Sequence, residues 1–187
     1  MLRQATPSDL NVICKAFQAR RDVFPHVRAD YVRRACEQGR CFYDSGVVII
    51  WQQYVKAVRL GDVTVPQGNV ILHQILNATN ERGTAAAVFQ RFCEFVTSLG
   101  VNVNLYLTVR ESNQRARRFY EKLGMRSIGR IAWAKGTIPG VIYAKFFARR
   151  PPSSQFKGFL SVFAFSSRPA PDVIVNGDRP RLRRRDA

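Results

Sequence analysis

The chain has 187 residues, of which 46% are hydrophobic, and its 30 lysines and arginines against 13 acidic residues give a net charge of +17. This length and composition predict one main globular domain and exclude an intrinsically disordered chain. The basic excess favours polyanions as partners and disfavours basic protein surfaces.

Membrane and metal-binding classes are disfavoured as well. The apolar runs are far shorter than a bilayer requires, and the first ten residues lack the basic-then-apolar layout of a signal peptide. We therefore expect a cytoplasmic protein that does not associate with membranes. Four cysteines without CxxC spacing and only two histidines predict neither a metal site nor a disulfide framework.

The first third of the chain predicts two helices and a hairpin. Residues 1–5 are compatible with a short strand, and "TPSDL" then has the hydroxyl, proline and acid expected at a helix start. A second helix is predicted over 28–38. Residues 40–44 and 46–55, rich in β-branched and aromatic types around turn residues, predict an antiparallel hairpin. The stretch "RLGDVTVPQG" is interpreted as a connection.

The second part alternates strands and helices. The segment "NVILHQIL" predicts a buried strand, and apolar residues spaced three and four apart predict a helix that ends at Gly100. A strand over 103–109, a helix over 113–123 and two strands over 126–135 and 140–147 complete the pattern. We see no internal repeat. These residues are predicted to form one domain over 1–147, followed by a partly flexible Pro/Arg-rich extension over 148–187.

The stretch "NATNERGTAAAVFQRF" joins the buried strand to its helix through a glycine-bearing turn. A helix start presents backbone N–H groups without partners in the helix and the positive end of the helix dipole, so it favours an anion such as a phosphate. Small residues around Gly83 allow the backbone to approach such a group closely. A short glycine motif is weak evidence by itself, since it is also compatible with an ordinary helix start.

Two motifs in this order resemble the GCN5-related N-acetyltransferase (GNAT) superfamily over roughly residues 1–147. The first is Asn80-Glu81-Arg82-Gly83-Thr84-Ala85, similar to the superfamily's pyrophosphate loop except that Asn80 replaces the usual Gln or Arg. The second is "NQRARRFYEKLGM", which is very similar to the later helix of the superfamily and is the more specific match. The resemblance implies a single-domain α/β GNAT fold, with a central mixed, mostly antiparallel twisted sheet flanked by helices.

The resemblance also implies an acyltransferase that uses acetyl-CoA as acyl donor and transfers its acetyl group to an amine. The residues that it implies for the donor are Asn80, Arg82, Gly83, Thr84, Ala85 and Asn113. Tyr120 matches the superfamily's general acid for the departing thiolate, and backbone N–H groups of the central strand would stabilise the oxyanion. Both Tyr120 and His73 can also be core residues. His73 is a candidate base in the central strand, and Gln74 is expected on the opposite face.

The acceptor is the most open question. Arginines near the first helices and in the tail favour a nucleic-acid acceptor, such as a modified DNA base, and we name Arg20, Arg21, Arg183, Arg184 and Arg185 as candidate contacts. Some bacteriophage DNA-modification proteins resemble this superfamily, which would place the chain in the host cytoplasm. The alternatives are a protein or small-molecule N-acetyltransferase and a non-catalytic nucleic-acid-binding protein with the same fold. The oligomeric state stays open.

Overall fold

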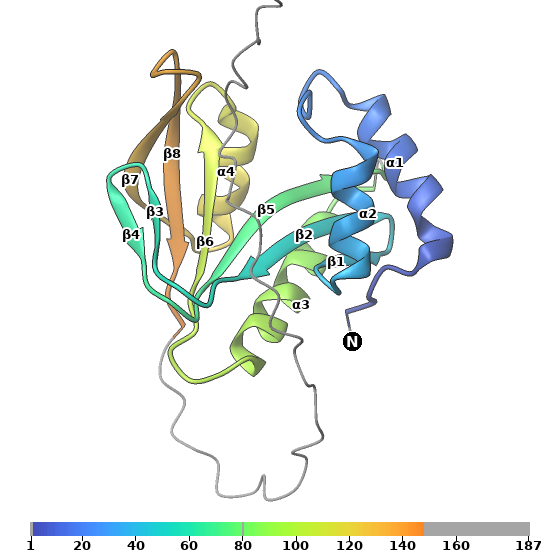
Figure 1. Ribbon diagram of the computed structural model, residues 1–187, viewed down its shortest axis with the longest axis horizontal. Helices are drawn as coiled ribbons and strands as arrows, with labels where there is room; N and C mark the ends of the chain where they lie inside the picture. Colours follow the sequence, from blue (N-terminus) through green and yellow to red (C-terminus); the bar gives the residue numbers. More distant parts are fainter. Residues whose placement is uncertain (1, 80, 148–187) are drawn as a thin grey trace, which may run out of the picture.

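The computed structural model describes residues 2–79 and 81–147, so Asn80 and the candidate contacts Arg183, Arg184 and Arg185 lie outside the described residues. One six-stranded sheet runs through the protein in the order β1-β2-β5-β6-β8-β7, and a separate two-stranded sheet pairs β3 with β4 (Figure 1). All pairings in the large sheet are antiparallel except that of β5 with β6. The predicted mixed, mostly antiparallel α/β fold is confirmed.

The strands lie close to the predicted segments. Their bounds are β1 Cys41–Asp44, β2 Val47–Gln53, β5 Val70–Asn77, β6 Leu105–Arg110, β7 Arg126–Trp133 and β8 Ile138–Lys145. The expected strand over 1–5 is reduced to a single bridge from Gln4 to Phe42. The chain turns away directly afterwards, because the Asp9 carboxylate accepts hydrogen bonds from the Thr6 backbone and from Arg3 and fixes a 3-10 turn over Pro7–Asp9.

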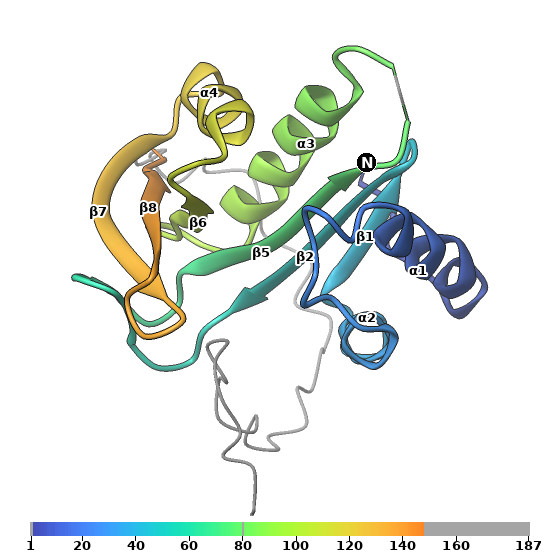
Figure 2. The same cartoon turned by 90° about the horizontal axis from the view of Figure 1, so that it is seen from above.

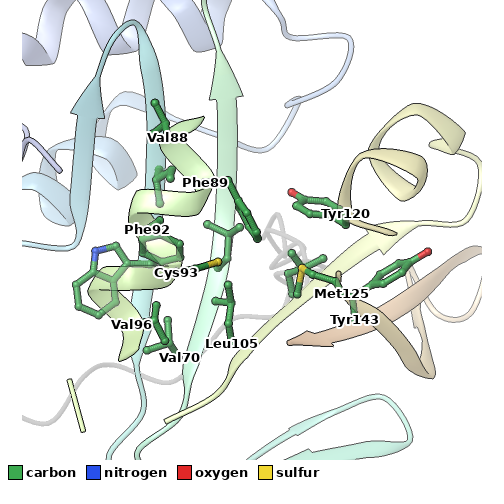
Figure 3. Packing of buried hydrophobic residues seen from close by; sticks show 14 of the residues in the cluster. Val70, Val88, Phe89, Phe92, Cys93, Val96, Leu105, Tyr120, Met125 and Tyr143 are labelled. Carbon is green, nitrogen blue, oxygen red and sulfur yellow. The ribbon is translucent and has the colours of Figure 1, made fainter. Parts of the chain in front are cut away.

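Helices cover both faces of the large sheet (Figure 2). On one face lie α3, Thr84–Ser98, and α4, Gln114–Lys122, and on the other lie α1, Leu10–Ala19, and α2, Ala29–Glu37. The apolar stripe of α3 fills the core of its face, where Val88, Phe89 and Phe92 are fully buried against strand residues such as Leu105 (Figure 3). Burial of this stripe on a sheet is what holds a helix of this periodicity in place.

The prediction that residues 59–68 form only a connection is wrong, because they contain most of a second hairpin. Strands β3, Val58–Leu60, and β4, Val63–Val65, pair with each other around Gly61 and Asp62. Leu60 and Val65 are buried in an apolar cluster with Ile71, on the α1/α2 side of the sheet. Each strand has only three residues, and this length is too short to produce a clear alternating pattern in the sequence.

The hairpin is held against β7 by a close backbone approach. The Asp62 carboxylate accepts a hydrogen bond from the Arg130 backbone N–H at 2.8 Å, and the Asp62 N–H donates to the Arg130 carbonyl at 3.2 Å. A side chain at Gly61 would place its Cβ 2.1 Å from the Arg130 carbonyl oxygen. Gly61 is therefore required by both its neighbour and its φ of +55°.

Replacement of Gly61 by alanine is expected to destabilise the protein by about 1–3 kcal/mol through overpacking, in addition to the cost of a positive φ. Gly136→Ala is the matched control, because Gly136 also has a positive φ and a Cβ there would meet nothing within 4 Å. The control should cost only about 1–2 kcal/mol for its backbone conformation. Urea unfolding of both variants measures the difference, and equal losses of stability would contradict the contact.

Candidate functional site

Strands β5 and β6 are parallel neighbours that pair only at their beginnings. The pairs are Val70 with Leu105, Ile71 with Tyr106 and Leu72 with Leu107. Beyond them β5 continues to Asn77 paired with β2 alone, and β6 continues to Arg110 paired with β8 alone. The two strands therefore part after Leu72, and the facing edge of each has backbone groups outside any strand pairing in the described chain. Such groups are available to a ligand.

A β-bulge in β5 lies at the point where the strands part. Ile50 of β2 pairs with Gln74 and Trp51 pairs with Leu72, so His73 is the extra residue. The prediction that His73 and Gln74 face opposite sides is wrong, because the bulge interrupts the alternation. Gln74 hydrogen-bonds to His26 in the α1–α2 loop, and His73 bonds to Tyr54, whose ring belongs to the apolar cluster on that same side.

The start of α3 has the geometry of an anion site. Gly83 is the N-cap residue with φ of +86°, and the first bond within the helix runs from the Ala87 N–H to the Gly83 carbonyl at 3.0 Å. The N–H groups of residues 83–86 thus precede the first helical hydrogen bond and lie at the positive end of the dipole. Arg82 is exposed beside them, and Thr84 and Ala85 are partly buried.

Helix α4 begins at Asn113, whose side-chain oxygen accepts a hydrogen bond from the Ala116 N–H at 3.1 Å. The same helix directs Tyr120 toward Phe89 of α3, with ring centroids 5.9 Å apart (Figure 3). Tyr120 is 6% exposed, and burial raises the pKa of its hydroxyl strongly, so the neutral phenol persists across the physiological range. Among the described residues, no hydrogen-bonding or charged group contributes to this shift.

A polar network that the sequence did not reveal fixes α4 to β8. The Tyr143 hydroxyl donates to the Glu121 carboxylate at 2.7 Å and accepts from the Arg117 guanidinium at 3.3 Å. The ring of Tyr143 is fully buried with its centroid 6.3 Å from that of Tyr120. Tyr120 is thus held between a packed helix and a packed strand. Alternation in β8 could have indicated that Tyr143 faces inward, but not which residue its hydroxyl contacts.

The other side of the sheet, toward α1 and α2, carries a second polar group around His73. The His73 Nε2 lies 3.2 Å from the Tyr54 hydroxyl. Burial and the nearby Arg40 guanidinium lower the pKa of His73 to about 4, so its imidazole is neutral near pH 7. Burial raises the pKa of Tyr54, and it raises that of Tyr31 to about 12, which keeps both hydroxyls protonated.

The α1–α2 loop borders the same side. Its His26 bonds to Gln74 at 3.1 Å, and burial together with the Arg110 charge at the end of β6 lowers the pKa of His26. Arg20 and Arg21 are exposed at the beginning of this loop, and Arg20 forms a long ion pair of 3.8 Å with Asp22. The structure therefore gathers Tyr120 and the α3 start on one side of the sheet and His73 on the other.

Residues 28–125 match the model of the Acetyltransferase (GNAT) family. The chain belongs to this family. The match includes the α3 start, the parting strands and the whole of the "NQRARRFYEKLGM" motif at α4, residues 113–125. A search of curated proteins gave no match.

Solved structures of GNAT proteins share the fold of this chain at low identity. A GNAT-family acetyltransferase from Bacillus cereus is 17% identical with a TM-score of 0.57, covering 80% of this chain and 98% of the other. Arabidopsis thaliana NAA60 in complex with acetyl-CoA is 18% identical with a TM-score of 0.55, covering 78% and 97%. Ard1 from Thermoplasma volcanium is 14% identical with a TM-score of 0.62, covering 80% and 98%.

Between residues 2 and 147, apart from Asn80, no group of three or more His, Cys, Asp or Glu side chains is arranged to hold a metal ion. In the same part of the chain no helix is long and apolar enough to cross a membrane.

The low pKa of His73 is expected to make stability fall with pH below neutrality. Because unfolding returns His73 to its ordinary pKa of 6.5, the unfolded state binds the proton first as the pH falls from about 6.5 toward 4. His26 contributes in the same direction. The free energy of unfolding, measured in urea at pH 7 and pH 4.5, should therefore drop less in His73→Asn than in the wild type. Equal drops in the two proteins would show that folding does not lower the pKa of His73.

Proposed function

We propose that this protein is an acetyl-CoA-dependent N-acetyltransferase that transfers an acetyl group to an amine. The observation that carries the proposal is that three features occur together: the candidate anion site at the start of α3, the unpaired edge of β5 and Tyr120 on α4. A ligand with a compact dianion at one end and a reactive acyl group at the other matches this arrangement. NAA60, which shares the fold, was solved with acetyl-CoA.

The donor pyrophosphate would bind the N–H groups at the α3 start. Gly83, Thr84 and Ala85 supply backbone donors without bulk, and Arg82 supplies a cation. We also assign Asn80 to this loop. The Asn113 side-chain oxygen caps α4, and its side-chain N–H₂ group remains available to the donor.

The reaction needs a neutral amine, a site for the oxyanion and a proton for the leaving group. The amine nitrogen attacks the thioester carbonyl, and the carbonyl oxygen becomes an oxyanion that backbone N–H groups of β5 beyond Leu72 are free to stabilise. The tetrahedral intermediate then collapses with cleavage of the C–S bond. Tyr120 gives its phenolic proton to the departing thiolate, which requires the neutral phenol that burial maintains.

His73 is the proposed proton acceptor on the acceptor side. Its imidazole is neutral, with one nitrogen bonded to Tyr54. A pKa of about 4 makes it a weak base for an ammonium ion, so an acceptor that arrives as the free amine suits this site better. His73 then serves to relay the proton released after attack.

A nucleic-acid acceptor is the second candidate, favoured by the net charge of +17 and by the exposed Arg20 and Arg21 beside the acceptor side. In this second candidate function, the enzyme acetylates an amine of a modified base, as a bacteriophage DNA-modification protein in the host cytoplasm would. Arg183, Arg184 and Arg185 in the C-terminal extension would add phosphate contacts. The competing acceptors are a protein or small-molecule amine, and a non-catalytic nucleic-acid-binding role would show no turnover.

Gly83→Asp tests the donor site against its uncharged isostere Gly83→Asn. Both substitutions place a Cβ at a positive φ with no neighbour within 4 Å, and only the aspartate adds negative charge beside the pyrophosphate. Calorimetry should show acetyl-CoA affinity lost in Gly83→Asp and reduced much less in Gly83→Asn, which adds bulk but no charge. Similar affinity in the two folded variants would contradict the assignment.

Tyr120→Phe keeps the buried ring and removes the hydroxyl. We expect kcat to fall about 100-fold or more, the usual effect of losing a general acid, with little change in acetyl-CoA affinity. Tyr106→Phe is the control, because it also removes one hydroxyl from a buried tyrosine but on the other face of the sheet, away from α4. An unchanged kcat in Tyr120→Phe, under conditions where chemistry limits the rate, would make Tyr120 a packing residue only.

Charge reversal of Arg20 and Arg21 to glutamate tests the second candidate. If nucleic acid binds here, affinity for duplex DNA should fall and the salt dependence should become shallower, by about 0.9 in log–log slope for each lost phosphate contact. Acetyl-CoA affinity should not change. Undetectable or salt-insensitive binding of DNA and RNA by the wild type, together with acetylation of a free small amine, would exclude the nucleic-acid acceptor.

A further inference from the structure

We propose that Arg40 binds a carboxylate or phosphate group of the acceptor, so that the substrate is a small amine that also carries a negative charge. This inference rests on the proposed N-acetyltransferase function and concerns the acceptor side of the same site.

Arg40 lies partly buried between α2 and the end of β2. Its guanidinium donates to the side-chain oxygens of Gln52, at 3.0 Å, and Gln38. Both partners are neutral amides, and none of the ion pairs in the described chain includes Arg40. A partly buried cation without a counter-ion is costly, and an anion bound there would offset this cost.

Other arginines of this chain show what a structural arginine looks like here. Arg91 on α3 pairs with Asp44 at 3.0 Å, and Arg3 pairs with Asp9 at 2.9 Å. Each of these ties two segments together through a carboxylate of the chain itself. Arg40 is partly buried like Arg91, whereas Arg3 is exposed. It keeps donors that its two glutamine partners leave unused, since a guanidinium has five N–H groups.

Arg40 is surrounded by the side chains of the proposed acceptor side, which are His73, Tyr31 and Tyr54. Its charge lowers the pKa of His73 and opposes the effect of burial on Tyr31 and Tyr54. In the described chain no carboxylate is among the groups that shift the pKa of these three side chains. The site thus has hydroxyl donors, neutral imidazole and a cation. This composition attracts an anion and repels polyamines or lysine-rich peptides, which need carboxylates near the amine.

Arg40 also favours the reactive form of the acceptor. A nearby cation disfavours protonation of an amine, because it destabilises a second positive charge. Pairing with Arg40 would also cancel the stabilisation that the acceptor's anionic group gives its own ammonium form, which favours the free base beside His73. This fits an imidazole whose pKa of about 4 makes it too weak to deprotonate an ammonium ion.

The first test compares kcat/KM for matched acceptors with and without the anion, using the full chain and saturating acetyl-CoA. The pairs are alanine with alaninamide, and O-phosphoethanolamine with ethanolamine, which separate carboxylate from phosphate. In Arg40→Gln the preference for the anionic member should fall at least about 10-fold relative to wild type, the effect of a lost charge-assisted hydrogen bond. The two acceptors of a pair differ in amine pKa, but this difference is the same for both proteins. It therefore cancels when the preference of Arg40→Gln is divided by that of the wild type.

Two variants control the comparison. Arg40→Lys keeps the charge and should retain part of the preference. Arg59→Gln removes an exposed arginine of β3 and should leave the preference unchanged. An unchanged ratio in Arg40→Gln, or a wild type that uses the neutral members equally well, would overturn the inference.

A second test needs no turnover and therefore separates failure of this inference from failure of the proposed function. The chain has only two histidines, so NMR can follow the His73 pKa directly, with His26 as an internal reference. Inorganic phosphate should raise the His73 pKa in the wild type and leave it unchanged in Arg40→Gln. A phosphate effect of the same size in both proteins, or none in the wild type, would show that Arg40 does not bind the anion, whether or not the protein binds acetyl-CoA.

Discussion

The parting of β5 and β6 after Leu72 is the constraint on which the site depends. Three residue pairs hold the two parallel strands together, and each strand then follows a different neighbour, β5 with β2 and β6 with β8. Backbone groups at the centre of a sheet are normally paired, so an unpaired edge in this position has to bind something else. The helices that follow the two strands, α3 and α4, place the candidate anion site and Tyr120 on the same face of the sheet (Figure 2).

Packing on both faces maintains this arrangement. The stripe of α3, the Phe89–Tyr120 contact and the Tyr143–Glu121 bond fix one face. On the other face, α1 and α2 cover β1 and β2, and the β3–β4 hairpin lies against β7, which leaves His73 and Gln74 between them. In the proposed reaction the sheet separates a donor side from an acceptor side, and the bulge at His73 directs two polar side chains to the proposed acceptor side.

Much of the fold follows from the sequence, because long segments with a clear apolar period and the α4 motif specify their own structure. The features that were missed depend on contacts between distant segments. Hairpin β3–β4 has strands too short to show a period, and the bulge at His73 is a property of the β2–β5 register. The group around Arg40 comes from α2, the start of β1, the end of β2 and β5, and nothing in the local sequence of any one of them indicates the others.

Hydrogen–deuterium exchange with and without saturating acetyl-CoA tests the central claim most directly, because it reports on the unpaired backbone itself. The account requires slower exchange in two places when acetyl-CoA is present: the part of β5 beyond Leu72 and the N–H groups of residues 83–86. The outer strands β1 and β7 serve as internal references and should not change. Unaltered exchange at both places, or protection confined to other parts of the chain, would contradict it.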